Sequence, residues 1–159
     1  MDNLLKIRFE MLPTKVDLFS TISESCSKII TLNYSKDFFY KVDIIIKELL
    51  KNAINNNKDE SRNIIVDIEL KEDKVVFSFS NIASREDFES LKNYLEKLKD
   101  DSFAHSHFIE VIKKQRIDNT TGGLGLNRIF KEKDCNRMDV NFDNEYLTVT
   151  AELETIWTK

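Results

Sequence analysis

The chain has 159 residues, of which 41% are hydrophobic and 33% charged, and this balance predicts one globular domain over residues 1–159 and excludes a disordered or fibrous protein. Lys and Arg total 24 against 28 Asp and Glu, with both signs interspersed and no basic stripe, which argues against nucleic-acid binding. Cys26 and Cys135 lack metal-ligand spacing, and neither a signal peptide nor a long apolar run is present, so we expect a reduced, cytoplasmic protein with no membrane partner.

The chain opens with the pattern of a strand followed by a helix. Apolar and polar residues alternate over residues 4–12, as in a half-buried strand, and Pro13 ends the alternation. Thr14 stands three residues before Asp17, a spacing that predicts a helix N-cap. Apolar residues then recur at helical spacing as far as Ile30. We therefore expect the first helix to start directly after the strand.

A second helix and a hairpin are predicted next. The helix should run from about Ser35 to the asparagine tract at residues 55–57, which is a plausible stop. Alternating apolar residues over 64–70 and 75–79 then predict two strands, joined by a polar turn around residues 72–73.

The C-terminal half predicts further helical segments and a second hairpin. Helical spacing recurs over residues 85–99, more weakly over 108–112, and again over 126–130. The closing hairpin has its strands over 138–142 and 147–153, with Asp143 and Asn144 at the turn.

This order segregates strands from helices rather than alternating them. It predicts an α+β fold, an α/β two-layer sandwich with a mixed, largely antiparallel sheet covered on one face by helices. A Rossmann unit would need a glycine-rich loop directly after the first strand, where residues 11–14 read Met-Leu-Pro-Thr. That class of dinucleotide-binding fold is therefore excluded.

One polar pair stands on the second helix beside its apolar stripe. Glu48 and Asn52 are one turn apart, so their side chains project from the same face. A carboxylate and an amide oxygen placed in this way offer a general base beside a donor that suits Mg²⁺. The alternative is an ordinary solvated helix face, because polar pairs at this spacing are common.

The glycines form the second candidate site. Average usage predicts roughly eleven glycines in a chain of this length, yet the sequence has three, Gly122, Gly123 and Gly125, all within four residues. Glycine costs backbone entropy, so this concentration indicates close backbone approach or unusual dihedral angles at one place. Glycines before a helix expose N–H groups that hold phosphate, although no Walker loop is present and a plain flexible loop is the alternative.

Taken together, these clusters and the element order resemble the Bergerat-fold (GHKL, histidine kinase-like) ATPases over nearly the whole chain. Glu48, Asn52 and Ala53 match the family's N-box, and residues 122–126 match its Gly-x-Gly-Leu box. Within the superfamily, the chain most resembles stand-alone bacterial anti-sigma serine kinases and SiaB-like kinases. In the SiaB-like group the first hairpin ends in an Asn-containing segment, which here reads Ser-Asn-Ile-Ala over residues 80–83.

The resemblance implies an ATP and Mg²⁺ site. Glu48 would be the catalytic base, Asn52 would hold Mg²⁺, and Ser80 or Asn81 would accept a hydrogen bond from the adenine amino group. Residues 84–121 would form a lid over the nucleotide. The residues implied to contact the nucleotide are Asn52, Asn55, Asn56, Ser80, Asn81, Thr121, Gly122, Gly123, Leu124, Gly125 and Leu126.

In function, the resemblance implies a serine/threonine protein kinase that phosphorylates a small partner protein in a partner-switching circuit. Homodimers are common among such regulators, so homodimerisation stays open. A second hypothesis is a catalytically inactive module of the same fold that sequesters a regulator, motivated by the altered segment over residues 80–83.

A third hypothesis is a small-molecule ATPase or a detached histidine-kinase domain. A sensor histidine kinase carries its phospho-accepting histidine on a helix before the N-box, whereas His105 and His107 follow it, in the expected lid. The two histidines also form an unconvincing metal pair, because no third ligand stands at a recognised spacing. We therefore expect both to be solvated lid residues.

Overall fold

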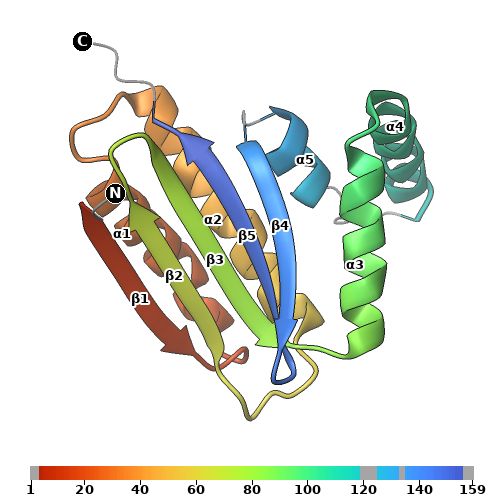
Figure 1. The fold of residues 1–159 in the computed structure, drawn as a ribbon, viewed down its shortest axis with the longest axis horizontal. Coiled ribbons are helices and arrows are strands. Elements are labelled where there is room, and N and C mark those ends of the chain that lie inside the picture. Colours follow the sequence, from red (N-terminus) through yellow and green to blue (C-terminus); the bar gives the residue numbers. More distant parts are fainter. Residues whose placement is uncertain (1–3, 119–124, 133–134, 156–159) are drawn as a thin grey trace.

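The protein folds as one five-stranded sheet with helices packed on one face and at one edge (Figure 1). A computed structural model describes residues 4–118, 125–132 and 135–155. The strands lie in the order β1-β2-β3-β5-β4, with every pairing between them antiparallel. Their bounds are β1 Leu5–Met11, β2 Ile64–Leu70, β3 Lys74–Ile82, β4 Cys135–Asp143 and β5 Tyr146–Glu154.

The prediction of an α+β fold is confirmed, but the sheet is wholly antiparallel in the described residues rather than mixed. Each hairpin is antiparallel within itself. The first hairpin, β2–β3, is joined to the second, β4–β5, by the pairing of β3 with β5, and these two strands also run in opposite directions. The side chains that alternate along these strands place Phe77, Phe79 and Ala151 in the buried core. The opposite face of the sheet carries pairs of hydroxyl side chains, such as Ser80 with Thr148.

Helices α1 (Phe19–Ile30) and α2 (Lys36–Asn56) cover the sheet face that holds the core (Figure 1). Helix α2 begins as predicted, because the Ser35 side chain accepts a hydrogen bond from the Phe38 backbone N–H. The predicted cap at Thr14 is wrong. A 3-10 turn over Val16–Leu18 comes first, and the N-cap of α1 is Leu18, without a side-chain bond.

Three further helices follow the first hairpin: α3 (Arg85–Leu98), α4 (Asp101–Asp118) and α5 (Gly125–Glu132). Helix α3 starts with a capping box between Ser84 and Asp87, and it packs against the edge strand β4. The weak helical pattern predicted over 108–112 belongs to α4, which is far longer than that pattern. Helix α5 lies between α2 and β4.

The turn of the closing hairpin lies one residue later than predicted. Asp143 still pairs with Tyr146, and the turn residues are Asn144 and Glu145, with φ of 49° and 69°. A two-residue hairpin turn of this hand needs positive φ at both central positions. The register of the strands therefore places Glu145, rather than Asp143, in the turn.

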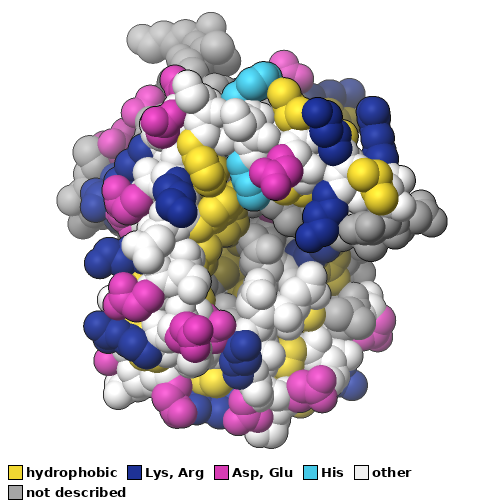
Figure 2. All heavy atoms as spheres, turned by 90° about the vertical axis from the view of Figure 1, so that its right-hand side faces the viewer, with side chains coloured by type: hydrophobic (Ala, Val, Ile, Leu, Met, Phe, Trp, Pro, Cys, Tyr) yellow, Lys and Arg dark blue, Asp and Glu magenta, His cyan; other side chains and the backbone are white. Residues whose placement is uncertain are grey.

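The surface agrees with the mixed charge pattern of the sequence. Over the face shown in Figure 2, acidic and basic side chains are interspersed around a central band of hydrophobic ones. Cys26 and Cys135 are both free and buried, and burial raises the pKa of the Cys135 thiol to about 11. No helix within the described residues has the combination of length and apolarity needed to cross a membrane.

Candidate functional site

A cavity of about 340 Å³ lies between α2, the centre of the sheet and α3. Its volume falls in the range that small-molecule sites occupy, roughly 300–1,000 Å³. Helix α2 contributes Asn52, Ala53 and Asn56 to the lining, and the strands contribute Phe79 and Asn81 among others. The cavity is therefore mostly apolar, with a few polar groups on opposite walls.

Glu48 lies one turn before Asn52 on α2, and its side chain is 22% exposed. The next residue of the helix, Leu49, is buried and lines the cavity. Because the apolar stripe of α2 packs into the core, the helix cannot rotate, and the directions of Glu48 and Asn52 are fixed. Asn52 of the predicted pair thus lines the cavity, and Glu48 lies next to Leu49, which also lines it.

Gly125, the first residue of α5, lies directly against Glu48. A Cβ atom built on Gly125 would overlap Oε2 of Glu48 and lie 3.3 Å from its Cδ. Close backbone approach, which the glycine cluster predicted, is therefore confirmed at this position. Leu126 also lies where it was predicted to contribute, because it lines the cavity. The remaining predicted residues of the cluster, Thr121, Gly122, Gly123 and Leu124, lie outside the described residues.

Arg128, which the sequence analysis did not single out, also reaches Glu48. Its guanidinium Nη1 lies 3.7 Å from Oε1 of the carboxylate. The sequence held a usable signal, since Arg128 follows Gly125 by three residues and so shares its face of the predicted helix. Helix α5 thus contacts the two oxygens of Glu48 through two different residues.

Asn81, rather than Ser80, faces the cavity. Asn81 is 3% exposed and lines the cavity beside Leu147, its partner across β5. Ser80 points to the other face of the sheet, where its hydroxyl lies 2.7 Å from that of Thr148. Successive residues of a strand alternate between faces, so only one of the two predicted candidates can reach the ligand space.

The amide nitrogen of Asn81 already has partners in the protein. It donates to the backbone carbonyls of Asn56, at 3.2 Å, and Ile82, at 3.1 Å. With its NH₂ group engaged in this way, the side chain offers its oxygen, a pure acceptor, to a ligand. Asn81 can therefore replace a carboxylate as a hydrogen-bond acceptor without leaving its own donors unpaired.

The other two predicted asparagines differ from each other. Asn56 lines the cavity, and its Nδ2 donates to the Asn52 carbonyl at 2.8 Å. Asn55 is exposed and is not among the residues that line the cavity. The helical spacing explains this difference, because Asn56 shares the face of Asn52 and Asn55 does not.

Helix α3 forms the opposite wall with Asp87, Ser90, Leu91 and Tyr94, none of which the sequence analysis singled out. The backbone N–H and hydroxyl of Ser84 both donate to Asp87, and these bonds hold the pKa of Asp87 below its usual value. Burial raises the pKa of Tyr94, so its hydroxyl stays protonated at neutral pH. Where it is described, the segment predicted as a lid, residues 84–121, forms the helices α3 and α4, joined through Lys99 and Asp100.

Two buried polar atoms around the cavity lack hydrogen-bond partners within the described residues: Nδ2 of Asn52 and the hydroxyl of Tyr94. An unpaired buried polar group costs about 1–3 kcal/mol. Such groups need an explanation, and a ligand that supplies oxygen acceptors between α2 and α3 would satisfy both.

The residues present suit a cation only together with a ligand. Within the described part of the chain, no three acidic, histidine or cysteine side chains converge on one point. A Mg²⁺ ion here would therefore depend on the Asn52 amide oxygen and on oxygens of a bound phosphate group.

The histidine pair does not form a metal site. His107 packs its ring between Tyr94 and Phe103, with centroid distances of 5.3 Å and 5.6 Å, whereas His105 is exposed. Residues two apart on a helix point in nearly opposite directions, so the two imidazoles diverge. His107 is thus a packing residue of the α3–α4 pair, where solvent exposure was predicted.

No protein-family model matches the chain, and no curated protein matches its sequence.

Proposed function

We propose that the protein is an ATP-dependent serine/threonine protein kinase with a Bergerat-type fold. In this proposal, ATP and Mg²⁺ occupy the cavity between α2 and α3, and the acceptor is a hydroxyl of a small partner protein. The antiparallel sheet, the paired helices before the first hairpin and the helix α5 beside α2 support the fold assignment. We place the protein in the cytoplasm and leave homodimerisation as an open part of the proposal.

The observation that carries the proposal is the contact between Glu48 and Gly125. These residues are far apart in the sequence and were singled out independently, one as a general base and one as part of a phosphate cradle. In the folded chain they touch, and their neighbours Leu49 and Leu126 both line the cavity. Asn52, one helical turn from Glu48, has an amide nitrogen with no hydrogen-bond partner among the described residues. Such convergence of a base, an amide and a helix N-terminus suits phosphoryl transfer.

The adenine would lie at the end of the cavity marked by Asn81. The Asn81 oxygen would accept a hydrogen bond from the amino group of the base, and Phe79, Leu147 and Val149 would supply apolar contacts. The family's usual acidic residue would bring more charge assistance. An affinity lower than that of an acidic relative is therefore expected.

The triphosphate would extend toward Asn52 and the start of α5. Bound Mg²⁺ would neutralise phosphate charge, and the Asn52 oxygen would hold it. Glu48 would accept the proton of a serine or threonine hydroxyl while that oxygen bonds to the γ-phosphorus. The bond from the γ-phosphorus to the bridging oxygen breaks at the same time, and its electron pair leaves with ADP.

Thermal unfolding with and without Mg-ATP tests nucleotide binding. Nucleotide at a hundredfold excess over its Kd should stabilise the protein by about 2.7 kcal/mol, which raises the Tm by several degrees. The absence of any shift at millimolar Mg-ATP would refute the proposal.

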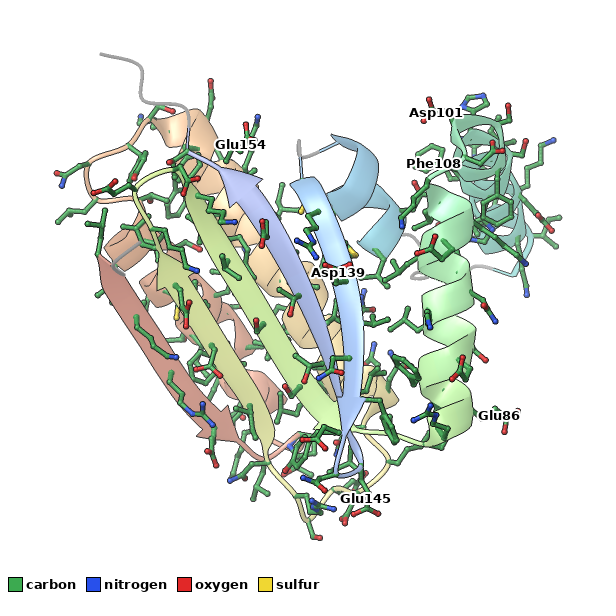
Figure 3. The ribbon with its side chains drawn as sticks, in the orientation of Figure 1. Glu86, Asp101, Phe108, Asp139, Glu145 and Glu154 are labelled. Carbon is green, nitrogen blue, oxygen red and sulfur yellow. The ribbon has the colours of Figure 1, made fainter. Side chains whose placement is uncertain are left out.

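Transfer of labelled phosphate from ATP to co-purified proteins tests catalysis. Glu48→Gln should lower the rate of transfer by about 10²- to 10⁴-fold and leave Mg-ATP binding intact, because a general base acts only in the chemical step. Glu86→Gln is the matched control, since Glu86 is exposed and points away from the cavity at the start of α3 (Figure 3). Equal rates in the two variants would show that Glu48 is not the base.

One observation favours the second candidate, a module that sequesters a regulator without catalysis. The Arg128 guanidinium lies 3.7 Å from Oε1 of Glu48, and Gly125 packs closely against Oε2. A base held in this way must be released before it can act. If Mg-ATP binds but no transfer occurs with the natural partner present, the binding-module function replaces the kinase function.

A further inference from the structure

Tyr94 on α3 lines the cavity, and its buried hydroxyl makes no hydrogen bond within the described residues. A buried tyrosine normally finds a partner for its hydroxyl, because leaving it unpaired costs free energy. Phenylalanine would pack equally well without that cost.

Packing, not hydrogen bonding, sets the position of this side chain. The ring of His107 on α4 meets the Tyr94 ring edge to face, and Phe103 stacks on His107 in turn. Helix α3 itself is held at Leu95, which is buried next to Tyr94 in the chain. The hydroxyl is therefore preorganised, which lowers the entropy cost of binding a ligand group.

The level of Tyr94 along the cavity indicates what it binds. At the adenine end, Asn81 contacts Asn56, and Lys58 lies 3.6 Å from Asp87. Tyr94 lies seven residues after Asp87 along α3, a distance of about 10 Å. Glu48 lies eight residues before Asn56 along α2, a distance of about 12 Å. Leu126, which follows Gly125, lines the same cavity. Tyr94 thus falls between the level of Asn52, which lies four residues or about 6 Å from Asn56, and that of Glu48, and not at the level of the residues assigned to the base.

We propose that Tyr94 is a specificity-determining residue whose hydroxyl donates a hydrogen bond to a phosphate oxygen of the bound nucleotide. This inference rests on the proposed nucleotide site and names the part of α3 that reads the ligand. Asn52 on α2 supplies a second buried donor, its Nδ2, from the opposite wall. The site would then recognise phosphate from both helices, and a ligand without phosphate would gain nothing from Tyr94.

Calorimetric titration of the whole chain with Mg-ATP and with adenosine tests this assignment. Tyr94→Phe should weaken Mg-ATP binding by about ten- to a hundredfold, the usual effect of losing a hydrogen bond to a charged group, and should leave adenosine binding unchanged. Tyr40→Phe removes an exposed hydroxyl on α2 and is the matched control, expected to change neither affinity. Equal weakening of both ligands would overturn the assignment to phosphate.

The stability of the ligand-free protein separates a binding role from a structural one. Because the hydroxyl has no hydrogen-bond partner among the described residues, Tyr94→Phe should not lower the Tm without ligand. A lower Tm together with unchanged Mg-ATP affinity would show a structural role and overturn the inference. If the wild type binds Mg-ATP and Tyr94→Phe binds it equally well, this inference fails and the proposed function stands. If the wild type binds no adenine nucleotide, both fail.

Discussion

The two walls of the cavity are built in different ways. The wall of α2 and β3 belongs to the core, where Leu49, Ala53 and Phe79 are almost fully buried and continue the packing of the sheet. The wall of α3 lies at the sheet edge, where it contacts β4 and α4, and most residues of this helix are exposed. The α2–β3 wall therefore stabilises the fold and also lines the cavity, whereas the α3 wall mainly lines the cavity.

This difference has a consequence for mutagenesis. Substitutions on the α2–β3 wall should change stability and ligand affinity together, since the same side chains maintain the core. Substitutions on the α3 wall should separate the two effects, because they disturb local bonds rather than the core. The next three variants test that distinction, in order of decreasing effect on stability.

Asn81→Asp is expected to have the largest effect, although an acid at this position is what the family resemblance favours. The variant places a carboxylate where the Asn81 amide donates to the carbonyls of Asn56 and Ile82. The Asn56 and Ile82 carbonyls then lose the Asn81 donor and face a charge, although the Ile82 carbonyl keeps its bond from the Lys58 N–H, and the change should cost about 3 kcal/mol at pH 7. Chemical denaturation measures this loss.

The pH dependence of Asn81→Asp gives a second readout. Repulsion by the two carbonyls raises the pKa of the new carboxyl in the folded state, so the neutral form is favoured. The loss of stability caused by the charge is therefore absent below the unfolded-state pKa of about 3.9, and it is complete once the pH has risen through the pKa of the folded state. Asn33→Asp, in an exposed loop, is the control. A loss as small as the control's would mean that Asn81 is not fixed by these bonds.

Asp87→Ala tests the α3 wall and should cost about 1 kcal/mol at pH 7 through loss of the capping box. The Ser84 donors lower the pKa of Asp87 in the folded state. The stabilisation is therefore present above the unfolded pKa of about 3.9 and is lost as the pH falls through the folded value. Urea unfolding at pH 7 and at pH 3 should show the difference from wild type shrinking in acid.

Asp37→Ala is the control for this variant, because Asp37 lies in the first turn of α2, whose Ser35 cap works without it. A pH-independent loss in Asp87→Ala, equal to that of the control, would contradict the capping role.

Gly125→Ala should have the smallest effect on stability. The new Cβ meets Oε2 of Glu48, the end of a flexible side chain that can move aside, so the free energy of unfolding should change by about 0.5 kcal/mol or less. Displacement of Glu48 should nevertheless lower phosphoryl transfer by roughly tenfold, because transfer depends on the position of the base. In a Glu48→Ala background the overlap is gone, and Gly125→Ala should not destabilise. A large loss of stability on adding Gly125→Ala to Glu48→Ala would show that the new Cβ clashes with a residue other than Glu48.

The sequence by itself determined most of the secondary structure and several of the polar side chains of the candidate site. Alternation and helical spacing predicted all five strands and a helix α2 that starts near Ser35, because these patterns express burial of one face. Spacing predicted that Glu48 and Asn52 share a face, and the concentration of glycine predicted close backbone approach or unusual dihedral angles. These are local properties, set by backbone geometry within a turn or two.

Only the tertiary structure decided which residues meet. It brought Gly125 and Arg128 to Glu48, selected Asn81 over Ser80, and placed Tyr94 in the cavity wall. The β3–β5 pairing and the docking of α3 on β4 join segments that are distant in the chain. No local periodicity encodes such contacts, because they arise from how the buried faces of separate elements fit together.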